Sequence, residues 1–243
     1  MITTTARRHK LVRLNTGGDG ARAGGRRWLT VAGVTGIGYT LSWVGGLSIK
    51  APSPKFTASG SAIVTALSGH GGAVLSQFAL TEGLPAVGLA VVSLALARAA
   101  RGSGARRNRA HLDGGGRGGA RWAGRAAAVA GLTAAAISAL QFVLGVALTR
   151  AAAPVAAHLL FEAVNRLDGV KMLTLAVLGL AGAATAALPR WLRGTGIALA
   201  AAITVSGVVY LLLLSSMWLA AGPALVLLLI FITGTGLVTG RAR

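Results

Sequence analysis

The stretch A-P-V-A-A-H-L-L-F-E-A-V-N-R-L-D-G-V-K-M, residues Ala153–Met172, gathers polar side chains that the rest of the chain avoids. The whole protein has five acidic residues and four histidines, and two of the acids and one of the histidines lie here. On a helix, at about 100° per residue, His158, Glu162 and Asn165 fall within an arc of about 60°, with Arg166 at its edge. A polar stripe this short predicts either a helix on the membrane surface or the lining of a site.

Long runs of Ala, Leu, Val and Gly lie on both sides of this stretch. The chain is 54% hydrophobic, only 12% of its residues are charged, and its mean hydropathy is +0.70. Soluble domains carry about 25% charged residues. Uncharged runs of about 20 or more residues recur, and a helix needs that length to cross the hydrocarbon core of a bilayer. The sequence therefore predicts an all-α, polytopic transmembrane helix bundle.

We expect six spans in this bundle, at about residues 28–49, 76–98, 126–148, 169–188, 196–219 and 223–240. The last two are separated only by residues 220–222, so they should form an antiparallel hairpin. The basic, glycine-rich segment 1–27 predicts a disordered cytoplasmic tail, and segment 100–125 a flexible basic cytoplasmic loop. Segment 153–168 is expected on the outer side as an amphipathic segment.

The basic residues are distributed unevenly between the predicted ends of the spans. The chain has 24 Lys and Arg residues and a formal net charge of +19. Seven lie in residues 1–27 and eight in residues 98–125; with Arg190, Arg193, Arg241 and Arg243, 19 of the 24 fall on one side. The other five are Lys50, Lys55, Arg150, Arg166 and Lys171. Because cytoplasmic loops carry the excess of Lys and Arg, this split predicts both termini inside.

The same charges indicate the partners. Attraction to anionic lipids at the cytoplasmic face of the bilayer accounts for basic loops without any nucleic acid. Apart from Trp122, no aromatic residues alternate with the arginines as a single-strand binding surface requires, so we expect no nucleic-acid binding. The expected location is the plasma (inner) membrane of a bacterium. A homo-oligomer or another membrane partner is left open.

Glu82 is the acidic residue that is hardest to explain as a surface group. The second span ends near Arg98, so it must recruit residues from about Val74 onward, which puts Glu82 in its outer third and Pro85 inside it. A kink is expected near Pro85, because proline lacks an N–H and clashes with the preceding turn. Either Glu82 lies within the membrane and marks a site, or it lies one turn further out among the headgroups.

Recognisable catalytic motifs are absent from the sequence. It has no cysteine, no phosphate-binding G-x-x-x-x-G-K-[ST] loop, no H-E-x-x-H and no S-x-x-K. We therefore expect no enzyme activity and no cofactor. His70 and His158 are both expected on the outer side, where two histidines across a bundle could hold a haem or a metal, and this stays as an alternative.

We expect the outer ends of the second, third and fourth spans to form one polar pocket. Outside the basic tail and loop, its candidate residues are nearly all the ionisable groups of the chain. They are Glu82, His158, Glu162, Asn165 and Arg166, with His70 as a further candidate. In the simpler alternative, Glu162 and Arg166 form a surface ion pair, and Asp168 stabilises the N-terminus of the fourth span.

Residues 178–210, L-G-L-A-G-A-A-T-A-A-L-P-R-W-L-R-G-T-G-I-A-L-A-A-A-I-T-V-S-G-V-V-Y, resemble bacterial multi-pass proteins of unknown function, the DUF4386-like group. In that group a span ends in a P-R-W-L-G type connector and a glycine-rich span follows. The resemblance covers about residues 170–216, and here Arg193 stands where the glycine is expected. The bias toward Arg, Ala and Gly also resembles proteins of high-GC actinobacteria. The resemblance implies a six-helix membrane bundle and transfers no functional residue.

These observations favour an integral membrane protein without catalytic machinery, with a role in sensing, scaffolding or envelope maintenance. The first alternative is a small permease or accessory transport subunit that uses Glu82, His158 and Glu162 as a polar, outward-facing path. The second alternative is a haem- or metal-binding membrane protein. These three candidate functions can be distinguished by whether the polar residues share one cavity.

Overall fold

The computed structural model describes residues 18–110, 117–212 and 217–241, and these residues form helices without any strand. The helices are α1 (Gly18–Ser48), α2 (Gly60–Leu67), α3 (Gly71–Phe78), the π-helical turn η1 (Ala79–Gly83), α4 (Leu84–Ala110), α5 (Arg117–Arg150), α6 (Pro154–Ala184), α7 (Arg190–Leu211) and α8 (Met217–Arg241). The prediction of an all-α bundle is confirmed. Within the described residues, five helical segments are long and apolar enough to cross a membrane. They are Gly71–Gly102, Arg121–Arg150, Pro154–Ala184, Arg190–Leu211 and Ala221–Arg241.

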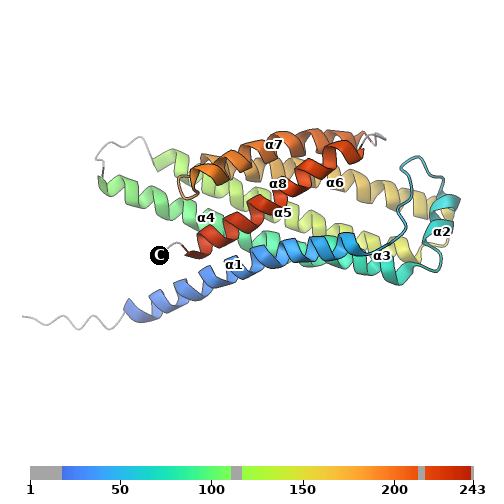
Figure 1. Ribbon diagram of the computed structural model, residues 1–243, viewed down its shortest axis with the longest axis horizontal. Helices are drawn as coiled ribbons and strands as arrows, with labels where there is room; N and C mark the ends of the chain where they lie inside the picture. The colour runs from blue at the N-terminus through green and yellow to red at the C-terminus, as the bar shows by residue number, and fades with distance from the viewer. Residues whose placement is uncertain (1–17, 111–116, 213–216, 242–243) are drawn as a thin grey trace, which may run out of the picture.

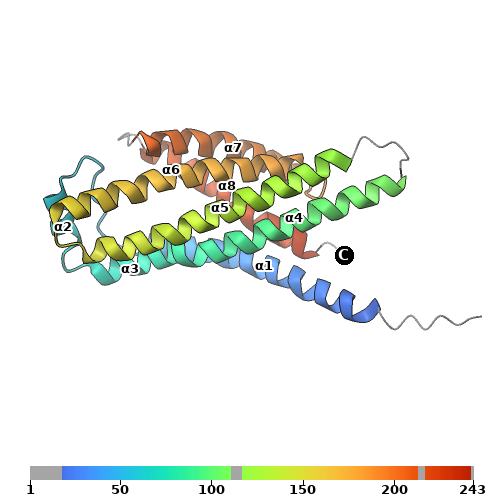
Figure 2. The ribbon, with the colours of Figure 1, turned by 180° about the vertical axis from the view of Figure 1, so that it is seen from behind.

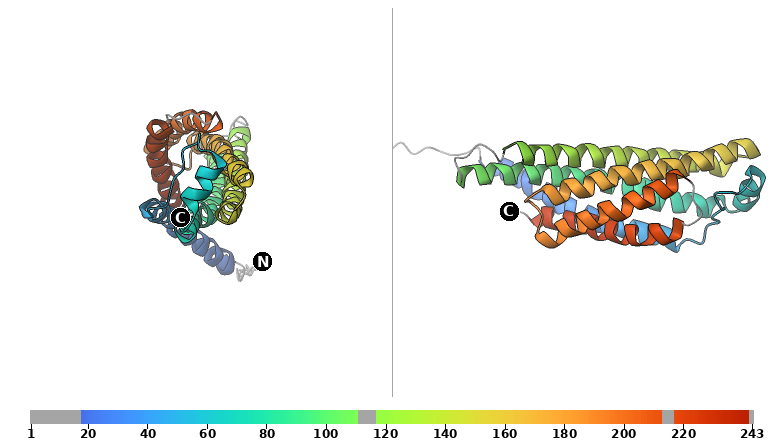
Figure 3. Two further views of the ribbon diagram at one scale, coloured as in Figure 1. Left: turned by 90° about the vertical axis from the view of Figure 1, so that its right-hand side faces the viewer. Right: turned by 90° about the horizontal axis from the view of Figure 1, so that it is seen from above.

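The long helices run along one axis and pack side by side (Figures 1 and 2). One end of the bundle holds the start of α1, the ends of α4, α6 and α8 and the start of α5, and we call it the basic end. The opposite end holds the short helix α2 and the start of α6, and we call it the α2 end. The view along the bundle shows the helices surrounding a shared interior, and the view from above shows the same two ends (Figure 3).

Large apolar side chains cover the outside of the bundle. Val34, Val87, Val129, Ile197 and Val226 are each more than half exposed, and they belong to five different helices. Soluble proteins rarely leave so much apolar surface uncovered, whereas a bilayer requires it. The length of the helices and their apolar outer surface fit an integral membrane protein.

Glycines bring several helices into direct backbone contact. A Cβ atom at Gly179 of α6 would lie 2.7 Å from the carbonyl oxygen of Gly196 of α7, so the backbones touch where these helices cross. A Cβ atom at Gly236 of α8 would lie 2.6 Å from the carbonyl oxygen of Ala32 in α1. Small residues allow this close approach in membranes, where helix association depends on van der Waals packing.

A break in the helical structure precedes the second predicted span. Gly69, between α2 and α3, has a φ of +75°, which ends the helical conformation there. From Gly71 onward the helix is continuous through η1 into α4. The irregular turn η1 lies directly before Pro85, where we expect a kink.

The π-helical turn has a physical cause in Pro85. Within η1 the N–H of Leu84 bonds to the carbonyl of Ala79, five residues earlier. The next such bond would join Pro85 to the carbonyl of Leu80, and proline has no N–H to donate. The hydroxyl of Ser42 in α1 donates to the Leu80 oxygen instead, at 2.5 Å. A hydroxyl from a neighbouring helix therefore satisfies the carbonyl that the proline leaves free.

The predicted boundaries differ from the structure at the basic end. Residues 18–27 belong to α1 rather than to a disordered tail, and residues 1–17 of that predicted tail lie outside the described residues. Most of the predicted loop 100–125 is helical, since α4 extends to Ala110 and α5 begins at Arg117, and residues 111–116 also lie outside the described residues. Extending an existing helix fixes one residue per new hydrogen bond, so a helix that starts in the membrane can continue into a segment rich in Ala and Arg.

Two further boundaries differ from the predictions. The segment 153–168 and the predicted span 169–188 are one continuous helix, α6, so Gly169 lies in its interior and the helix ends at Ala184. The last two long helices are separated after Leu211, because α8 already begins at Met217 and contains Pro223. The expected hairpin connection at residues 220–222 is therefore wrong. Proline is tolerated inside membrane helices because neighbouring groups can satisfy the freed backbone atoms.

Candidate functional site: a buried ion cluster beside a pocket

Three charged side chains meet in the interior of the bundle. The ammonium nitrogen Nζ of Lys171 lies 2.8 Å from both carboxylate oxygens of Glu82 and 2.6 Å from Oδ1 of Asp168. The side chains of Lys171, Glu82 and Asp168 are only 6%, 8% and 18% exposed. We call these three residues the ion cluster. Buried charges are stable only when they are paired in this way, so each member depends on the other two.

Two helical segments that are distant in sequence bring the ion cluster together. Asp168 and Lys171 are three residues apart on α6, a spacing that places both side chains on one face. Glu82 comes from η1, 89 residues earlier in the chain. The hydroxyl of Ser138 on α5 also lies beside the Glu82 carboxylate. The cluster thus joins the second, third and fourth predicted spans.

Gln141 of α5 links the ion cluster to the adjacent backbone. Its Nε2 donates to the carbonyl oxygen of Val164 at 3.0 Å and to Oδ1 of Asp168 at 3.3 Å. Because both partners are acceptors, the amide nitrogen must face them, and this fixes the orientation of the side chain. The amide oxygen Oε1 is buried and has no hydrogen-bond partner among the residues that the structure describes. Gln141 therefore holds a buried acceptor that none of these residues satisfies.

A pocket of about 240 Å³ extends from the ion cluster to residues 52–54 at the α2 end. Glu82, Gln141 and Asp168 line its inner part. Polar and aromatic side chains from α1, α3, η1, α6 and α7 surround them: Trp43, Gln77, Thr81, Asn165 and Tyr210. A pocket with an apolar wall and a few convergent polar groups is the usual form of a small-molecule site.

Two of the six predicted site residues lie on this pocket. Glu82 is buried in the ion cluster, within a segment long and apolar enough to span a membrane, as in the first of the two placements we considered. Asn165 also lines the pocket, and its Nδ2 donates to the carbonyl oxygen of Phe161 at 2.7 Å. Segments from all three predicted spans surround the pocket, and Glu82 and Asn165 are the two predicted residues that line it.

The other four predicted residues lie elsewhere. Glu162 and Arg166 form an ion pair at 2.5 Å whose side chains are 30% and 57% exposed, in agreement with the surface alternative. His158 and His70 are both exposed, and neither lines the pocket. Nδ1 of His70 lies 2.9 Å from the carbonyl oxygen of Ser68. Apart from Asn165, the predicted polar stripe of α6 therefore does not face the interior.

Helical geometry explains which side of α6 is buried. Ala157, Val164, Asp168 and Lys171 fall within about 60° of one another on a helix, and they form its inner face. His158, Glu162 and Arg166 lie about 100–180° away from Ala157 around the same helix. The face with the larger number of polar residues is thus the outer one.

The predicted role of Asp168 at a helix N-terminus is wrong. Since α6 begins at Pro154, Asp168 lies in its fourth turn, beyond the first turn in which the helix dipole acts. Its carboxylate contacts Lys171 and Gln141 instead. The difference follows from the continuity of α6 across Gly169.

Lys171, Gln141 and Tyr210 belong to the site but are not among the residues predicted from the sequence. Lys171 could have been predicted from the sequence, because it lies three residues after an acid and is followed by an apolar run. A Glu82 buried in the membrane would also require a cation. Gln141 is one of few polar groups in the third span. Tyr210 has no feature in the sequence that distinguishes it, since it lies within the apolar run of the fifth predicted span.

Within the part of the chain that the structure describes, no group of three His, Cys, Asp or Glu side chains could hold a metal ion. The two histidines of the haem or metal alternative do not line the pocket. The ion cluster has only two carboxylates, and both contact the Lys171 ammonium. The chemistry of the site is thus that of a charged hydrogen-bonding pocket.

Comparison of the chain with family models, with curated proteins and with solved structures found no match.

Proposed function

We propose that the protein spans the membrane six times, with both termini in the cytoplasm. Five spans are the apolar helices named above, and α1 is the sixth. Its central part contacts α8 through a hydrogen bond of 2.7 Å between Thr40 and Thr233, and Gly36 packs against Gly236. Because α1 lies along α8 in the bundle (Figure 1), it must share the surroundings of α8. The excess of arginine at the basic end supports the orientation.

The orientation can be tested by single-cysteine labelling, since the chain has no cysteine of its own. We expect Ser53→Cys, near the α2 end, to react with a membrane-impermeant maleimide in intact cells. Ser103→Cys and Thr195→Cys, toward the basic end, should react only after the cells are opened. Labelling of Ser103→Cys in intact cells at the rate of Ser53→Cys would contradict the orientation.

We infer further that the pocket binds a small cation that carries N–H groups. This inference rests on the charge balance at the inner end of the pocket, where the two carboxylates of Glu82 and Asp168 contact the single ammonium of Lys171. The formal net charge of the ion cluster is therefore −1. The unpartnered oxygen of Gln141 adds an acceptor to the same wall. A primary ammonium or guanidinium group would supply both the missing charge and the missing donors.

A small permease or accessory transport subunit fits these features better than a scaffold. Ionisable residues within a membrane are costly, and they mark ligand or ion paths by default. Glu82 also lies in a π-helical turn, and interrupted helices are typical of transporter binding sites and of functional sites in general. A sensor that binds the same cation without moving it is the alternative role. The likeness to DUF4386-like proteins and a bacterial inner membrane stay predictions.

Binding of methylammonium to the purified protein tests this proposal. We expect the wild type to bind methylammonium chloride in detergent, measured by isothermal titration calorimetry against sodium chloride. Asp168→Asn should weaken this binding roughly tenfold or more, because it removes a charged partner while its amide oxygen can still accept from Gln141. Uptake into proteoliposomes then separates a permease from a sensor.

Glu162→Gln is the matched control, because it removes the same charge from the outer face of the same helix. It should leave methylammonium binding within about twofold of the wild type, since the exposed Glu162–Arg166 pair contributes little. Equal losses in Asp168→Asn and Glu162→Gln would refute the pocket as the site. No binding of methylammonium or guanidinium by the wild type would refute the proposed ligand class.

A further inference from the structure

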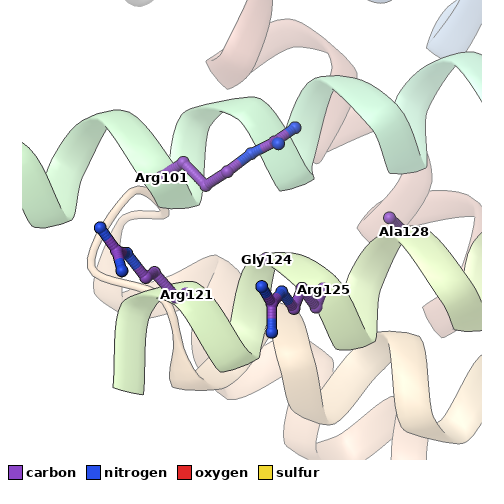
Figure 4. Close-up of a pocket in the computed structure, with 5 residues that line it drawn as sticks. All are labelled: Arg101, Arg121, Gly124, Arg125 and Ala128. Atoms are coloured by element: carbon purple, nitrogen blue, oxygen red, sulfur yellow. The ribbon is translucent and has the colours of Figure 1, made fainter. Parts of the chain in front are cut away.

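A second pocket lies at the basic end, between α4 and α5. Its volume is about 420 Å³, and its lining residues are Arg101, Arg121, Gly124, Arg125 and Ala128. Figure 4 shows that Arg101 comes from α4 and that the other four come from α5. It is distinct from the ion cluster, which lies toward the opposite end of the bundle, so it does not depend on the cation binding proposed above and rests only on the proposed orientation.

The backbone forms a close contact beside this pocket. A Cβ atom at the buried Gly124 would lie 3.0 Å from the carbonyl oxygen of Ala97 and 3.5 Å from Cγ of Arg101. The two helices therefore touch at Gly124, which lines the pocket together with the three arginines. Nε of Arg101 donates to the same Ala97 oxygen at 3.2 Å, which fixes the inner part of its guanidinium group.

The three arginines of this pocket lack an acidic neighbour among its lining residues. Of the acids whose side chains the structure describes, Glu82 and Asp168 contact Lys171 and Glu162 contacts Arg166. All three belong to the half of the molecule toward the α2 end. The positive charge of the pocket is thus not balanced by any of these three carboxylates, and this favours the binding of an anion.

The position of the pocket along the helices matches the headgroup region of a bilayer. In α4 the uncharged run of residues 83–97 ends just before Arg98 and Arg101, and in α5 the uncharged run of residues 126–149 begins just after Arg121 and Arg125. Trp122, next to Arg121, is 61% exposed, and indole rings prefer the membrane–water interface. An anion at this level is therefore next to the phosphates of the lipid headgroups.

We propose that this pocket binds the phosphate group of an anionic lipid, held by the guanidinium groups of Arg101, Arg121 and Arg125. Guanidinium presents a planar set of donors that matches phosphate oxygens, and basic pockets between membrane helices on the cytoplasmic side bind lipid headgroups. The lipid tails would lie along the exposed apolar surface that continues from the pocket, which includes Val129. A free phosphate ion shares the headgroup chemistry but lacks these tails.

The test measures binding of short-chain phosphatidylglycerol to the full-length protein in detergent by isothermal titration calorimetry. Short-chain phosphatidylcholine and inorganic phosphate are titrated in parallel. We expect phosphatidylglycerol to bind at least tenfold more tightly than either of the other two. Arg101→Gln/Arg125→Gln should weaken it roughly tenfold or more, since each arginine near an anionic headgroup contributes severalfold.

Arg190→Gln/Arg241→Gln is the charge-matched control, because both arginines are exposed at the same end but outside the pocket. It should change the affinity by less than about threefold. Equal losses in the two double variants would overturn the proposal, since they would reduce the effect to overall charge. Equal affinities of the wild type for phosphatidylglycerol and phosphatidylcholine would also overturn the proposal, regardless of the results for the variants. Inorganic phosphate binding as tightly as phosphatidylglycerol would assign the pocket to a free anion instead.

Discussion

Lys171→Met is expected to destabilise the protein by about 3–5 kcal/mol, the range found when one partner of a buried ion pair is removed. In the wild type, the carboxylates of Glu82 and Asp168 each lie within 3 Å of Lys171 Nζ. Without the ammonium, these two negative charges are left together in the interior. Methionine keeps a similar length, so the loss is mainly one of charge. Reversible unfolding in mixed micelles measures the difference.

Two comparison variants separate the loss of charge from the loss of packing. Arg166→Met breaks the exposed pair with Glu162 on the same helix and should cost less than about 0.5 kcal/mol. The double variant Glu82→Gln/Lys171→Met removes both charges of one pair and should recover a large part of the stability, because double-mutant coupling is strong within one network. A double variant that loses the sum of the two single effects would show that the charges do not interact.

Gly196→Leu is expected to have an effect of similar size, about 3 kcal/mol or more, because the new side chain meets backbone that cannot move aside. Any Cβ atom at this position would lie 2.6 Å from the carbonyl oxygen of Gly179 on α6 and 3.0 Å from the ring of Phe231 on α8. The variant must push α7 away from α6. Thermal unfolding followed by size-exclusion chromatography measures the loss of folded protein.

Gly194→Leu is the matched control, since it introduces the same side chain two residues earlier on α7. No atom lies within 4 Å of a Cβ at Gly194, so the leucine meets open space. The expected effect is neutral, or a gain of up to about 1 kcal/mol, because leucine favours a helix more than glycine does. Equal losses in Gly194→Leu and Gly196→Leu would contradict the close crossing of α6 and α7.

The class of the protein could be predicted from the sequence because it depends on local properties of the chain. Uncharged runs about as long as a bilayer is thick predict helices that lie in lipid, wherever their neighbours are. The concentration of arginine around residues 98–125 distinguishes one end of the bundle from the other without any knowledge of packing. The irregular helix before Pro85 is local in the same sense, since it follows from one missing N–H.

The composition of the site was decided only by the tertiary structure. Helical spacing alone groups His158, Glu162 and Asn165, but it cannot tell which face of α6 turns inward, and packing against α5 and α7 buries the face with Val164 and Lys171 instead. Lys171, the cation that pairs with Glu82, lies 89 residues further along the chain. This pairing cannot be predicted from the hydropathy of the sequence, because only the fold brings Glu82 next to Lys171.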